Sequence, residues 1–489
     1  MAPNSLEFLF HPQSVAIVGA SANPNSFGCD MMKHILDYGF KGQIYPINSR
    51  QSEILGVKAF PDLSSVPATI DYVICCIGVN NVPALIDQCQ SKKVRALHIL
   101  AGRSAETGRA EAKDMEMQVL KKARECGLRL IGPNCLGIFS PEDGLAFGYD
   151  FPREPGPVGA IIQSGGNSTE LVHIGSLRGL RFSKVVSYGN ALDINQNDLI
   201  EYFTSDPQTR VIVCYIEGVK GDAREFLKLV RRAAESKPII ICKGGRTSVG
   251  ARLTATHTAT LAGSGKIWEV AMRQVGAIPA RHIDEAVNLA LAFSLLPPIT
   301  GRRVGIVGCG GGRSILSADC WAENGFEVPE LPGNIREEFK RRGSQIWDWI
   351  GNPADCSIIV AGDPFTMEAM AAEMAQNSAF DFIAADAEED PPFDRDHFIQ
   401  ELTDSCEGYI NVKKKYTKPL LVVFDERSPG IAEGESWNYQ LRASLRSRLV
   451  AEKVPFFPSV DEAAKAVNEM IKYYHRHKFR SINSGIADA

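Results

Sequence analysis

The chain has 489 residues, a length that corresponds to about three domains rather than one. Apolar residues make up 44% of it and charged residues 23%, which is ordinary for a globular protein whose domains each bury a core. The net charge of −5 gives no electrostatic reason to expect nucleic acid or an anionic membrane surface as a partner.

The 12 cysteines are scattered, and most of them lie in or beside apolar runs. This pattern favours buried free thiols in a reducing compartment over disulfides or a metal site, so we expect no bound metal. No charged segment followed by an apolar one opens the sequence, and no apolar run reaches about 18 residues. We therefore expect a cytoplasmic protein that contacts no membrane.

Short β-branched apolar runs alternate with longer helical patterns along nearly the whole chain. This alternation is typical of parallel sheets that helices cover on both faces. The first strand-like runs lie at residues 14–21, 43–49, 70–78, 96–102 and 128–134. The helical patterns between them lie at residues 28–39, 81–91 and 109–126.

Two loops divide the chain into a series of such units. A stretch rich in Pro, Gly and acidic residues at 139–157 predicts one linker, and the paired prolines within 295–303 predict another. Further strand-like runs lie at residues 159–166, 182–190, 210–218 and 237–245, and then at 302–312, 380–387 and 418–425. Helices are expected at 222–235 and 460–476. The sequence thus predicts three consecutive doubly wound α/β domains, at residues 1–145, 155–296 and 300–480.

The first glycine-rich loop, VAIVGASANPNSFG, places Gly19 directly after a strand and Gly28 where a helix begins. Such a turn lets the backbone approach a phosphate group, and the helix start offers unpaired amide donors. The second strand ends in PINSR, without the acid that binds the ribose of NAD, so NAD is disfavoured. Arg50 suits a ligand with an extra phosphate, such as CoA or NADP, and a purely structural turn is the alternative.

The densest chemistry lies in CKGGRTSVGARLTATHTATLAGSGKIWEVA, residues 242–271. His257 is flanked there by Thr256 and Thr258, and such small neighbours leave an imidazole sterically open. The glycines of the segment predict a mobile loop more than a rigid helix. A neutral imidazole is a good nucleophile toward phosphorus, although a capping or plain loop histidine explains the same residue.

Two strand ends in the second predicted domain offer partners for this histidine. Glu217 ends the run VIVCYIEG at the sheet edge where α/β ligand sites form, and a solvated carboxylate is the alternative. The segment IIQSGGNSTE supplies a strand, two glycines and a helix that is expected to open with Asn167. A similar turn, GCGGGRSILS, opens the third domain and is interpreted as a duplicated scaffold turn, a docking surface or part of an acyl pocket, with a third nucleotide site as the alternative.

Several of these segments together resemble one family. IYPINSR, AGRSAETG and IGPNCLG in the first domain, and KGGRTSVGAR followed by THTATLAG in the second, resemble the NDP-forming acetate–CoA ligase branch of the succinyl-CoA synthetase superfamily. VSYGNALDINQNDL matches a further block of the family through Asn190, Asp193 and Asp198, and GNPADC another through Asn352, Pro353 and Asp355. The resemblance covers about residues 8–470.

The resemblance implies a Rossmann-like CoA-binding domain followed by two flavodoxin-like ligase domains. It implies that His257 carries a phosphoryl group and that Glu217 orients it. The residues implied to hold that phosphate are Gln163, Ser164, Gly165, Gly166 and Asn167. The residues implied to bind CoA are Gly19, Ala20, Ser21, Gly28, Asn48, Arg50, Ala101 and Gly102.

Departures from the family pattern lie at Gly78 and Arg103, beside the CoA site, and at Ala259 and Thr260, just after the histidine. Cys135 in IGPNCLG is expected to be a small buried thiol beside a turn rather than a nucleophile.

No segment reads as an ATP-grasp domain, and a phosphate-binding P-loop motif is absent. The resemblance therefore implies an α subunit that needs a separate ATP-grasp β subunit, in an α2β2 assembly, to bind most of the ATP, ADP and Mg²⁺. The implied reaction converts a small carboxylic acid, CoA and ATP to acyl-CoA, ADP and phosphate through acyl phosphate and phosphohistidine. The alternative is a CoA-binding transferase or regulatory component with the same fold and no phosphate relay.

Overall fold

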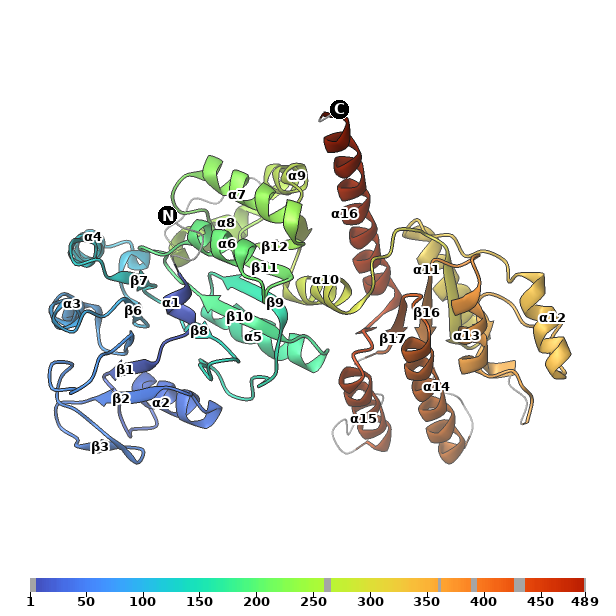
Figure 1. Cartoon of the computed structure of the whole chain (residues 1–489), viewed down its shortest axis with the longest axis horizontal. Helices are drawn as coiled ribbons and strands as arrows, with labels where there is room; N and C mark the ends of the chain where they lie inside the picture. The colour runs from blue at the N-terminus through green and yellow to red at the C-terminus, as the bar shows by residue number, and fades with distance from the viewer. Residues whose placement is uncertain (1–5, 259–264, 359–361, 388–393, 426–435, 488–489) are drawn as a thin grey trace. The chain divides into compact units, whose positions relative to one another are not determined.

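The computed structural model is described for residues 6–258, 265–358, 362–387, 394–425 and 436–487 (Figure 1). Side chains are described for all of these except residues 255–258, 309, 356 and 478–487. The chain divides into two compact units, residues 1–176 with 180–286 and residues 177–179 with 287–489. In the described part of the chain, no helix combines the length and apolarity needed to cross a membrane.

Five parallel strands form the first sheet, in the order β2-β1-β5-β6-β7. These strands are β1 (Ser14–Val18), β2 (Gln43–Ile47), β5 (Tyr72–Cys75), β6 (Ala96–Ile99) and β7 (Arg129–Ile131). A hairpin of β3 (Glu53–Ile54) and β4 (Val57–Lys58) follows β2. The helices of this part are α1 (Glu7–Phe10), α2 (Phe27–Tyr38), η1 (Val79–Asn81), α3 (Val82–Ser91), η2 (Ala105–Thr107) and α4 (Ala110–Glu125).

Both faces of this first sheet are buried. Along β1, Val15 and Ile17 belong to a core that includes α2, whereas Ala16 and Val18 belong to a second core that includes α3 and α4. Successive side chains of a strand point to opposite faces, so a strand covered on both faces is apolar throughout, as β1 is. The doubly wound arrangement predicted from the sequence is confirmed.

The second sheet has six strands in the order β13-β12-β11-β9-β10-β8, and β8 alone runs antiparallel to its neighbour. The strands are β8 (Gly137–Phe139), β9 (Pro155–Ile162), β10 (Phe182–Ser187), β11 (Val211–Ile216), β12 (Ile239–Lys243) and β13 (Ile278–Ala280). The helices are α5 (Gly165–Leu177), α6 (Gln196–Ser205), α7 (Ala223–Ser236), α8 (Ser248–Thr258), α9 (Gly265–Val275) and α10 (Ile283–Leu295).

The third sheet lies in the second unit and has the order β15-β14-β16-β17-β18. Its strands are β14 (Val304–Cys309), β15 (Ala354–Asp355), β16 (Phe382–Asp386), β17 (Leu420–Val423) and β18 (Phe456–Phe457). The helices are α11 (Gly311–Glu323), α12 (Gly333–Arg342), η3 (Cys356–Ile358), α13 (Met367–Gln376), α14 (Arg395–Lys415), α15 (Trp437–Ala451) and α16 (Val460–Ala487). Gly308, near the end of β14, has φ +96° and lies so close to the Asp386 carbonyl that a methyl group would sit 2.3 Å from its oxygen.

All three sheets share one order. Counted along the chain, the parallel strands of each sheet run 2-1-3-4-5, and the order reverses between the first and third strands. Ligands of open α/β sheets bind outside the carboxyl ends of the strands at such a reversal. There, a methyl group on Gly19 would lie 2.7 Å from Ile77, and the backbone N–H of Glu217 donates to Gln163 Oε1 at 2.8 Å. The fold therefore brings two predicted site loops to two such crevices.

The first predicted linker is wrong in part. Phe139 lies in β8 and residues 155–157 lie in β9, so both ends of the 139–157 stretch belong to the second sheet. Between them, Phe147 and Phe151 are buried, and the Phe139 and Phe151 rings pack 4.9 Å apart. A linker was expected from the Pro, Gly and acidic residues, but three aromatic side chains of the same stretch are buried and pack on one another.

Candidate functional site

The loop after β1 is built for close backbone contacts. Gly19 has φ +86°, and a methyl group on Gly28 would lie 2.0 Å from the Gly19 carbonyl oxygen. The first turn of α2 therefore sits directly on this loop. Ser26 caps the helix, because its side chain accepts a hydrogen bond from the Cys29 amide. Ser21 accepts the Asn23 N–H at 3.0 Å, which tightens the same turn.

The end of β2 is tied to the same loop. Asn48 Nδ2 donates to the Ala20 carbonyl at 2.8 Å, and Asn48 Oδ1 accepts the backbone N–H of Arg50 at 2.8 Å. Arg50 itself is exposed. The structure thus brings Gly19, Ala20, Gly28 and Asn48 together and leaves the Arg50 side chain at the surface.

The loops after β9 and β11 meet through one buried amide. Gln163 is 1% exposed, and its Oε1 accepts the backbone N–H groups of Glu217 at 2.8 Å and Gly218 at 3.2 Å. Its Nε2 is buried and has no hydrogen-bond partner in the described part of the chain. A buried donor without a partner costs free energy, so this nitrogen is suited to a ligand acceptor.

Glu217 itself is 5% exposed and sits against the end of β12. Its carboxylate accepts a hydrogen bond from the Tyr215 hydroxyl at 3.3 Å, and its carbonyl accepts one from Lys243 Nζ at 2.7 Å. A methyl group on Gly244 would lie 2.6 Å from the Tyr215 hydroxyl and 3.1 Å from the Glu217 side chain. Burial lowers the pKa of Lys243 and raises that of Tyr215. Glu217 is therefore a positioned group, in contrast to the solvated carboxylate considered as the alternative.

His257 lies in the last turn of α8, and its side chain is outside the described residues, as are Ala259 and Thr260 altogether. The prediction of a loop is wrong for residues 248–258 and 265–275, which are helical, while residues 259–264 lie outside the described residues. Within α8 only Gly250 interrupts residues that tolerate a helix, and the left-handed Gly245 (φ +71°) lies before it. α8 lies beside η2 of the first sheet's domain.

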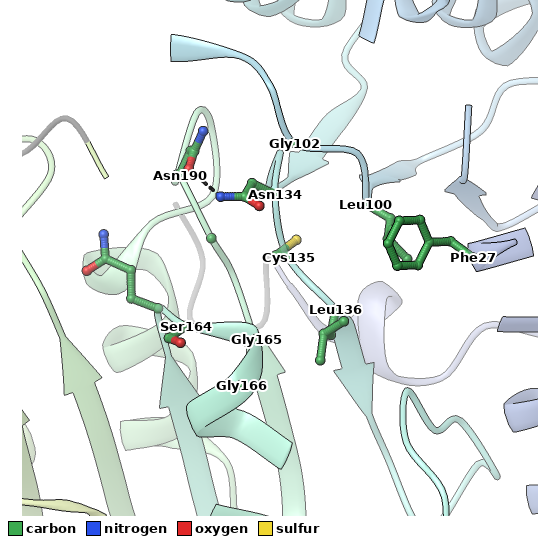
Figure 2. A pocket seen from close by; sticks show the side chains of 12 residues that line it. Phe27, Leu100, Gly102, Asn134, Cys135, Leu136, Ser164, Gly165, Gly166 and Asn190 are labelled. Atoms are coloured by element: carbon green, nitrogen blue, oxygen red, sulfur yellow. Dashed lines mark hydrogen bonds between the residues drawn. The ribbon is translucent and has the colours of Figure 1, made fainter. Parts of the chain in front are cut away.

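A cavity of about 310 Å³ lies where the loops of the first two sheets meet (Figure 2). Four residues of the predicted phosphate loop line it, namely Gln163, Ser164, Gly165 and Gly166. From the predicted CoA site Gly102 lines it, and Ala101 lies just before that residue and accepts the Asn134 N–H at 3.2 Å. The Gly102 turn and the predicted phosphate loop therefore share one cavity, whereas the other residues predicted to bind CoA, Gly19, Ala20, Ser21, Gly28, Asn48 and Arg50, are not among those that line it.

The helix at this cavity begins earlier than expected. α5 starts at Gly165 rather than at Asn167. Asn167 is not among the residues that line the cavity, and its backbone N–H donates to the Ser164 hydroxyl at 3.4 Å. The first helical turn thus begins with two glycines that line the cavity, and neither adds a side chain of its own between a phosphate and the helix backbone.

Sequence reasoning missed several residues that line the cavity, both apolar side chains and residues of two turns. The missed lining residues are Phe27, Leu100, Asn134, Leu136 and Gly189. Asn134 has φ +60° and Gly189 has φ +56°, and a methyl group on Gly189 would lie 2.4 Å from the Asn134 carbonyl oxygen. The one signal in the sequence was the large apolar Phe27 directly before Gly28, inside a loop otherwise made of small and polar residues.

Asn190 lines the cavity and is hydrogen-bonded to the turn that contains Arg103, where the sequence departs from the family pattern. Its Nδ2 donates to Glu106 at 2.7 Å and also lies 3.2 Å from the Ser104 hydroxyl, while its Oδ1 accepts from Asn134. Hydrogen bonds from Ser104 and Asn190 lower the pKa of Glu106 against the opposing effect of burial. Arg103 has φ +67°, and its backbone N–H donates to Glu106, so this carboxylate holds a strained turn at the cavity edge.

Cys135 is the buried thiol that the sequence predicted. It is 4% exposed, and burial raises the pKa of its thiol well above the ordinary value, so the thiolate needed for nucleophilic attack is disfavoured. His98 Nε2 donates to its carbonyl oxygen at 3.0 Å. Its place on the cavity wall is therefore that of a small apolar group.

The remaining matched positions have structural hydrogen bonds. Asp193 pairs with Arg129 at 2.7 Å, and Asp198 forms a capping box with Asn195 at the start of α6. Asn352 accepts the Ile306 N–H and donates to two backbone carbonyls. Asp355 accepts from the Ser357 amide and hydroxyl, at 2.8 and 2.6 Å.

Comparisons with known proteins agree with this architecture. Residues 13–141 match the CoA binding domain family, and residues 155–293 match the succinyl-CoA ligase like flavodoxin domain family. The α subunit of acetate–CoA ligase [ADP-forming] I from Pyrococcus furiosus is 37% identical over 66% of this chain and 71% of its own length. The chain belongs to the ADP-forming acetate–CoA ligase family. The resemblance drawn from the sequence motifs is confirmed.

Other members of this family differ in length. An ADP-forming acetate–CoA ligase from Methanocaldococcus jannaschii is 36% identical over 68% of this chain, and the match spans 47% of that longer protein. A solved structure of a dinucleotide forming acetyl-coenzyme A synthetase from Ca. Korarchaeum cryptofilum, in complex with phosphate and ADP, has a TM-score of 0.78 and 27% identity. That match covers 97% of this chain and 98% of the other, so the whole described fold is one that the family uses.

Proposed function

We propose that the chain is the α subunit of an ADP-forming acyl-CoA synthetase and that His257 relays the phosphoryl group. The observation that carries this proposal is the shared cavity, in which the Gly102 turn of the CoA-binding domain faces the Gln163–Gly166 loop of the ligase domain. A thiol and an acyl phosphate must meet for thioester synthesis, and here one cavity joins a loop suited to each. The relatives named above are ligases, so the transferase alternative has no support of its own.

CoA would be held by its diphosphate on the loop after β1. Gly19, with a positive φ, and Gly28, packed on the Gly19 carbonyl, leave the backbone open, and the capped start of α2 offers amide donors. Arg50 is exposed where an additional phosphate of the nucleotide end would lie. From there the pantetheine would run past the Ala101–Gly102 turn into the cavity.

The phosphoryl group would be held on the other side of the cavity. Amides of Gly165 and Gly166 at the start of α5 and the unpartnered Nε2 of Gln163 are suited to its oxygens. Glu217, fixed by Tyr215 and by the Gln163 bond to its amide, would orient the imidazole of His257 and stabilise its charged form.

The reaction would then proceed in three transfers. A nitrogen of His257 attacks the γ-phosphorus of ATP, and ADP leaves. The carboxylate oxygen of the acid attacks the phosphohistidine, which gives acyl phosphate and frees the imidazole. The CoA thiol loses its proton and attacks the acyl carbonyl, so that inorganic phosphate leaves with the acyl-CoA formed. Covalent relay of this kind divides one difficult transfer into easier steps.

A partner subunit follows from the names of the relatives that are α subunits. We propose that this partner carries an ATP-grasp domain, in an α2β2 assembly, and that it binds most of the ATP, ADP and Mg²⁺. The reactions at the cavity involve acid, CoA and phosphate alone. They can therefore be tested without the partner.

The test runs the cavity reactions in reverse, with the full chain, an acyl-CoA panel and labelled inorganic phosphate. Phosphate attacks the thioester, CoA leaves, and the acyl phosphate formed donates its phosphoryl group to His257. We expect an acid-labile, base-stable label on the wild-type chain and none on His257→Ala. Glu217→Gln should retain the fold and label at least about tenfold more slowly, because an amide no longer stabilises the charged imidazole.

A matched control tests whether the loss of any carboxylate, rather than that of Glu217, slows the labelling. Glu235→Gln changes a carboxylate on α7 that takes no part in the cavity, and it should label at the wild-type rate. If His257→Ala acquires the same label as the wild type, the relay is wrong.

A further inference from the structure

Polar side chains lie at the carboxyl ends of three neighbouring parallel strands of the second sheet, in the order β12-β11-β9 (Figure 1). Lys243 is the last residue of β12, Glu217 follows β11 and Gln163 follows β9. Ile216 and Lys243 are paired in register, and the Gln163 N–H donates to the Tyr215 carbonyl at 3.0 Å. Glu217 therefore lies between a lysine on one side and a glutamine on the other.

The two flanking side chains bind both backbone groups of Glu217. Its N–H donates to Gln163 Oε1 at 2.8 Å, and its carbonyl oxygen accepts from Lys243 Nζ at 2.7 Å. When both groups are bound, the peptide planes on either side of the Cα atom are fixed, and they set the direction of the side chain. Gln163 already belongs to the proposed phosphate site, whereas Lys243 has no part in the proposed reaction.

Lys243 also reaches α9, the next helix after α8. Its ammonium lies 5.6 Å from the centroid of the Trp268 ring, in the first turn of α9, and donates to the Gly244 carbonyl. A methyl group on Gly265, the first residue of α9, would lie 2.5 Å from the Arg246 carbonyl oxygen. The start of α9 is thus held at the end of β12 in two places, and one of them is this lysine.

A buried lysine at this position is costly for folding. Lys243 is only 6% exposed, and burial lowers the pKa of its ammonium although the charge of Glu217 opposes that shift. Hydrogen bonds to carbonyl groups and contact with a ring replace the lost hydration only in part. Residues 239–242 of the same strand are apolar, as is usual for a buried parallel strand. A buried charge beside the proposed reactive carboxylate is therefore interpreted as functional.

We propose that Lys243 is a positioning residue, which holds Glu217 from the side opposite Gln163 and so keeps its carboxylate in place for the imidazole of His257. This inference rests on the proposed function, because it assigns a residue that acts through Glu217. Without the ammonium, the Glu217 carbonyl loses its bond to β12, and the carboxylate is no longer preorganised for the phosphoryl transfer.

The experiment labels the full chain with labelled phosphate and the acyl-CoA that labels the wild type fastest. Lys243→Met keeps an unbranched stem without the ammonium, and we expect a maximal labelling rate at least about tenfold lower. The phosphate concentration that gives half the maximal rate should stay unchanged, because the phosphate loop is intact. Lys243→Gln, with an uncharged amide one bond nearer the backbone, should show the same loss, so the test stands if Lys243→Met does not fold.

A second lysine that donates to two carbonyl groups provides the matched control. Lys237 lies just before the amino end of β12, and its Nζ donates to the Phe203 carbonyl at 2.9 Å and the Asp206 carbonyl at 2.5 Å. Burial lowers its pKa as well. Lys237→Met should therefore lower the melting temperature, as Lys243→Met does, but it should label at the wild-type rate.

A double variant tests whether Lys243 acts through Glu217. Glu217→Gln is expected to label at least about tenfold more slowly by itself, so two independent losses would multiply to about a hundredfold. We expect Glu217→Gln/Lys243→Met to label no more slowly than Glu217→Gln alone, because the position of a side chain that no longer stabilises the imidazole does not matter.

Each outcome has a separate meaning. If Lys243→Met labels at the wild-type rate, or if the double variant shows the multiplied loss, Lys243 does not position Glu217 while the relay stands. A changed half-maximal phosphate concentration with an unchanged maximal rate would make Lys243 a phosphate-binding residue instead. Equal slowing by Lys237→Met would reduce both lysines to a role in folding and overturn the inference. If no acyl-CoA labels the wild type, the proposed function fails, and this inference fails with it.

Discussion

At the scale of single residues, His98 shows how a buried side chain supports the cavity without entering it. The ring on β6 is fully buried, Nε2 donates to the Cys135 carbonyl, and Nδ1 has no hydrogen-bond partner among the described residues. A methyl group on Gly137 would lie 2.6 Å from the ring. The glycine therefore allows the ring to fit beneath the turn that carries Cys135.

This burial predicts a dependence of stability on pH. Burial lowers the pKa of His98 to about 4, whereas in the unfolded chain it is about 6.5. Between these values the unfolded chain binds more protons, so stability is full above about pH 6.5 and falls as the pH decreases toward 4. The loss from this residue is at most about 3 kcal/mol.

Urea unfolding of the first unit at several pH values measures this effect. His98→Gln should lower stability at pH 8, because the buried bond and packing are disturbed, but it should make the decrease between pH 7 and pH 5 less steep. His397→Gln, at an exposed position on α14, should leave the slope unchanged. If stability decreases between pH 7 and pH 5 as steeply in His98→Gln as in the wild type, His98 is not the source of this pH dependence.

Residues that act through a local motif could be predicted from the sequence, and residues that act only through tertiary proximity could not. Gln163, Gly165 and Gly166 follow a strand and Glu217 ends another, so their sheet edge was predictable. Leu100 and Leu136 look like ordinary core residues in the sequence. Only the meeting of two sheets turns them into a cavity wall.

At the scale of elements, the start of α5 offers a matched pair of glycines. A methyl group on Gly166 meets nothing within 4 Å, whereas one on Gly165 would lie 3.1 Å from Leu136. Alanine favours a helix over glycine, so Gly166→Ala should stabilise the protein by about 0.5 kcal/mol or more. Gly166 nevertheless lines the cavity, where the proposed phosphate site needs an open backbone.

We therefore expect Gly166→Ala to raise the melting temperature while it slows histidine labelling at least about tenfold, since the phosphate can no longer reach the helix amides. Gly165→Ala should instead press on Leu136 and lower the melting temperature slightly. Calorimetry and the labelling assay on the same samples give both quantities. Full labelling by Gly166→Ala would mean that this helix start does not bind the phosphate.

Other elements depend on tertiary packing and could not be recognised from the sequence pattern. The helix α8 was expected as a loop because of its glycine-rich surroundings, yet those glycines flank the helix more than they interrupt it. The strand β8 is only three residues long and pairs antiparallel with β10, so no period was there to detect. In contrast, the long helices at the predicted positions 28–39 and 109–126 lie within a residue of their observed bounds at both ends.

At the scale of the whole molecule, the first two sheets share one core. Ile17 and Ile74 of the first sheet and Ile161 and Ile212 of the second belong to the same buried cluster. Phe10 of α1 stacks on Tyr202 of α6 with ring centroids 4.5 Å apart. Such shared burial couples their unfolding, so the three predicted domains need not be three folding units.

We predict two thermal transitions in calorimetry of the full chain, one for each compact unit, rather than three. Phe10→Ala should lower the first unit's transition as a single peak, because truncating a buried phenylalanine costs about 3–5 kcal/mol and this ring belongs to the cluster that both sheets share. Phe339→Ala, an equally buried ring in the core of the second unit, should lower only the other transition. If Phe10→Ala divides the first peak into two, each of the two sheets unfolds independently, and the shared core does not make them one cooperative unit.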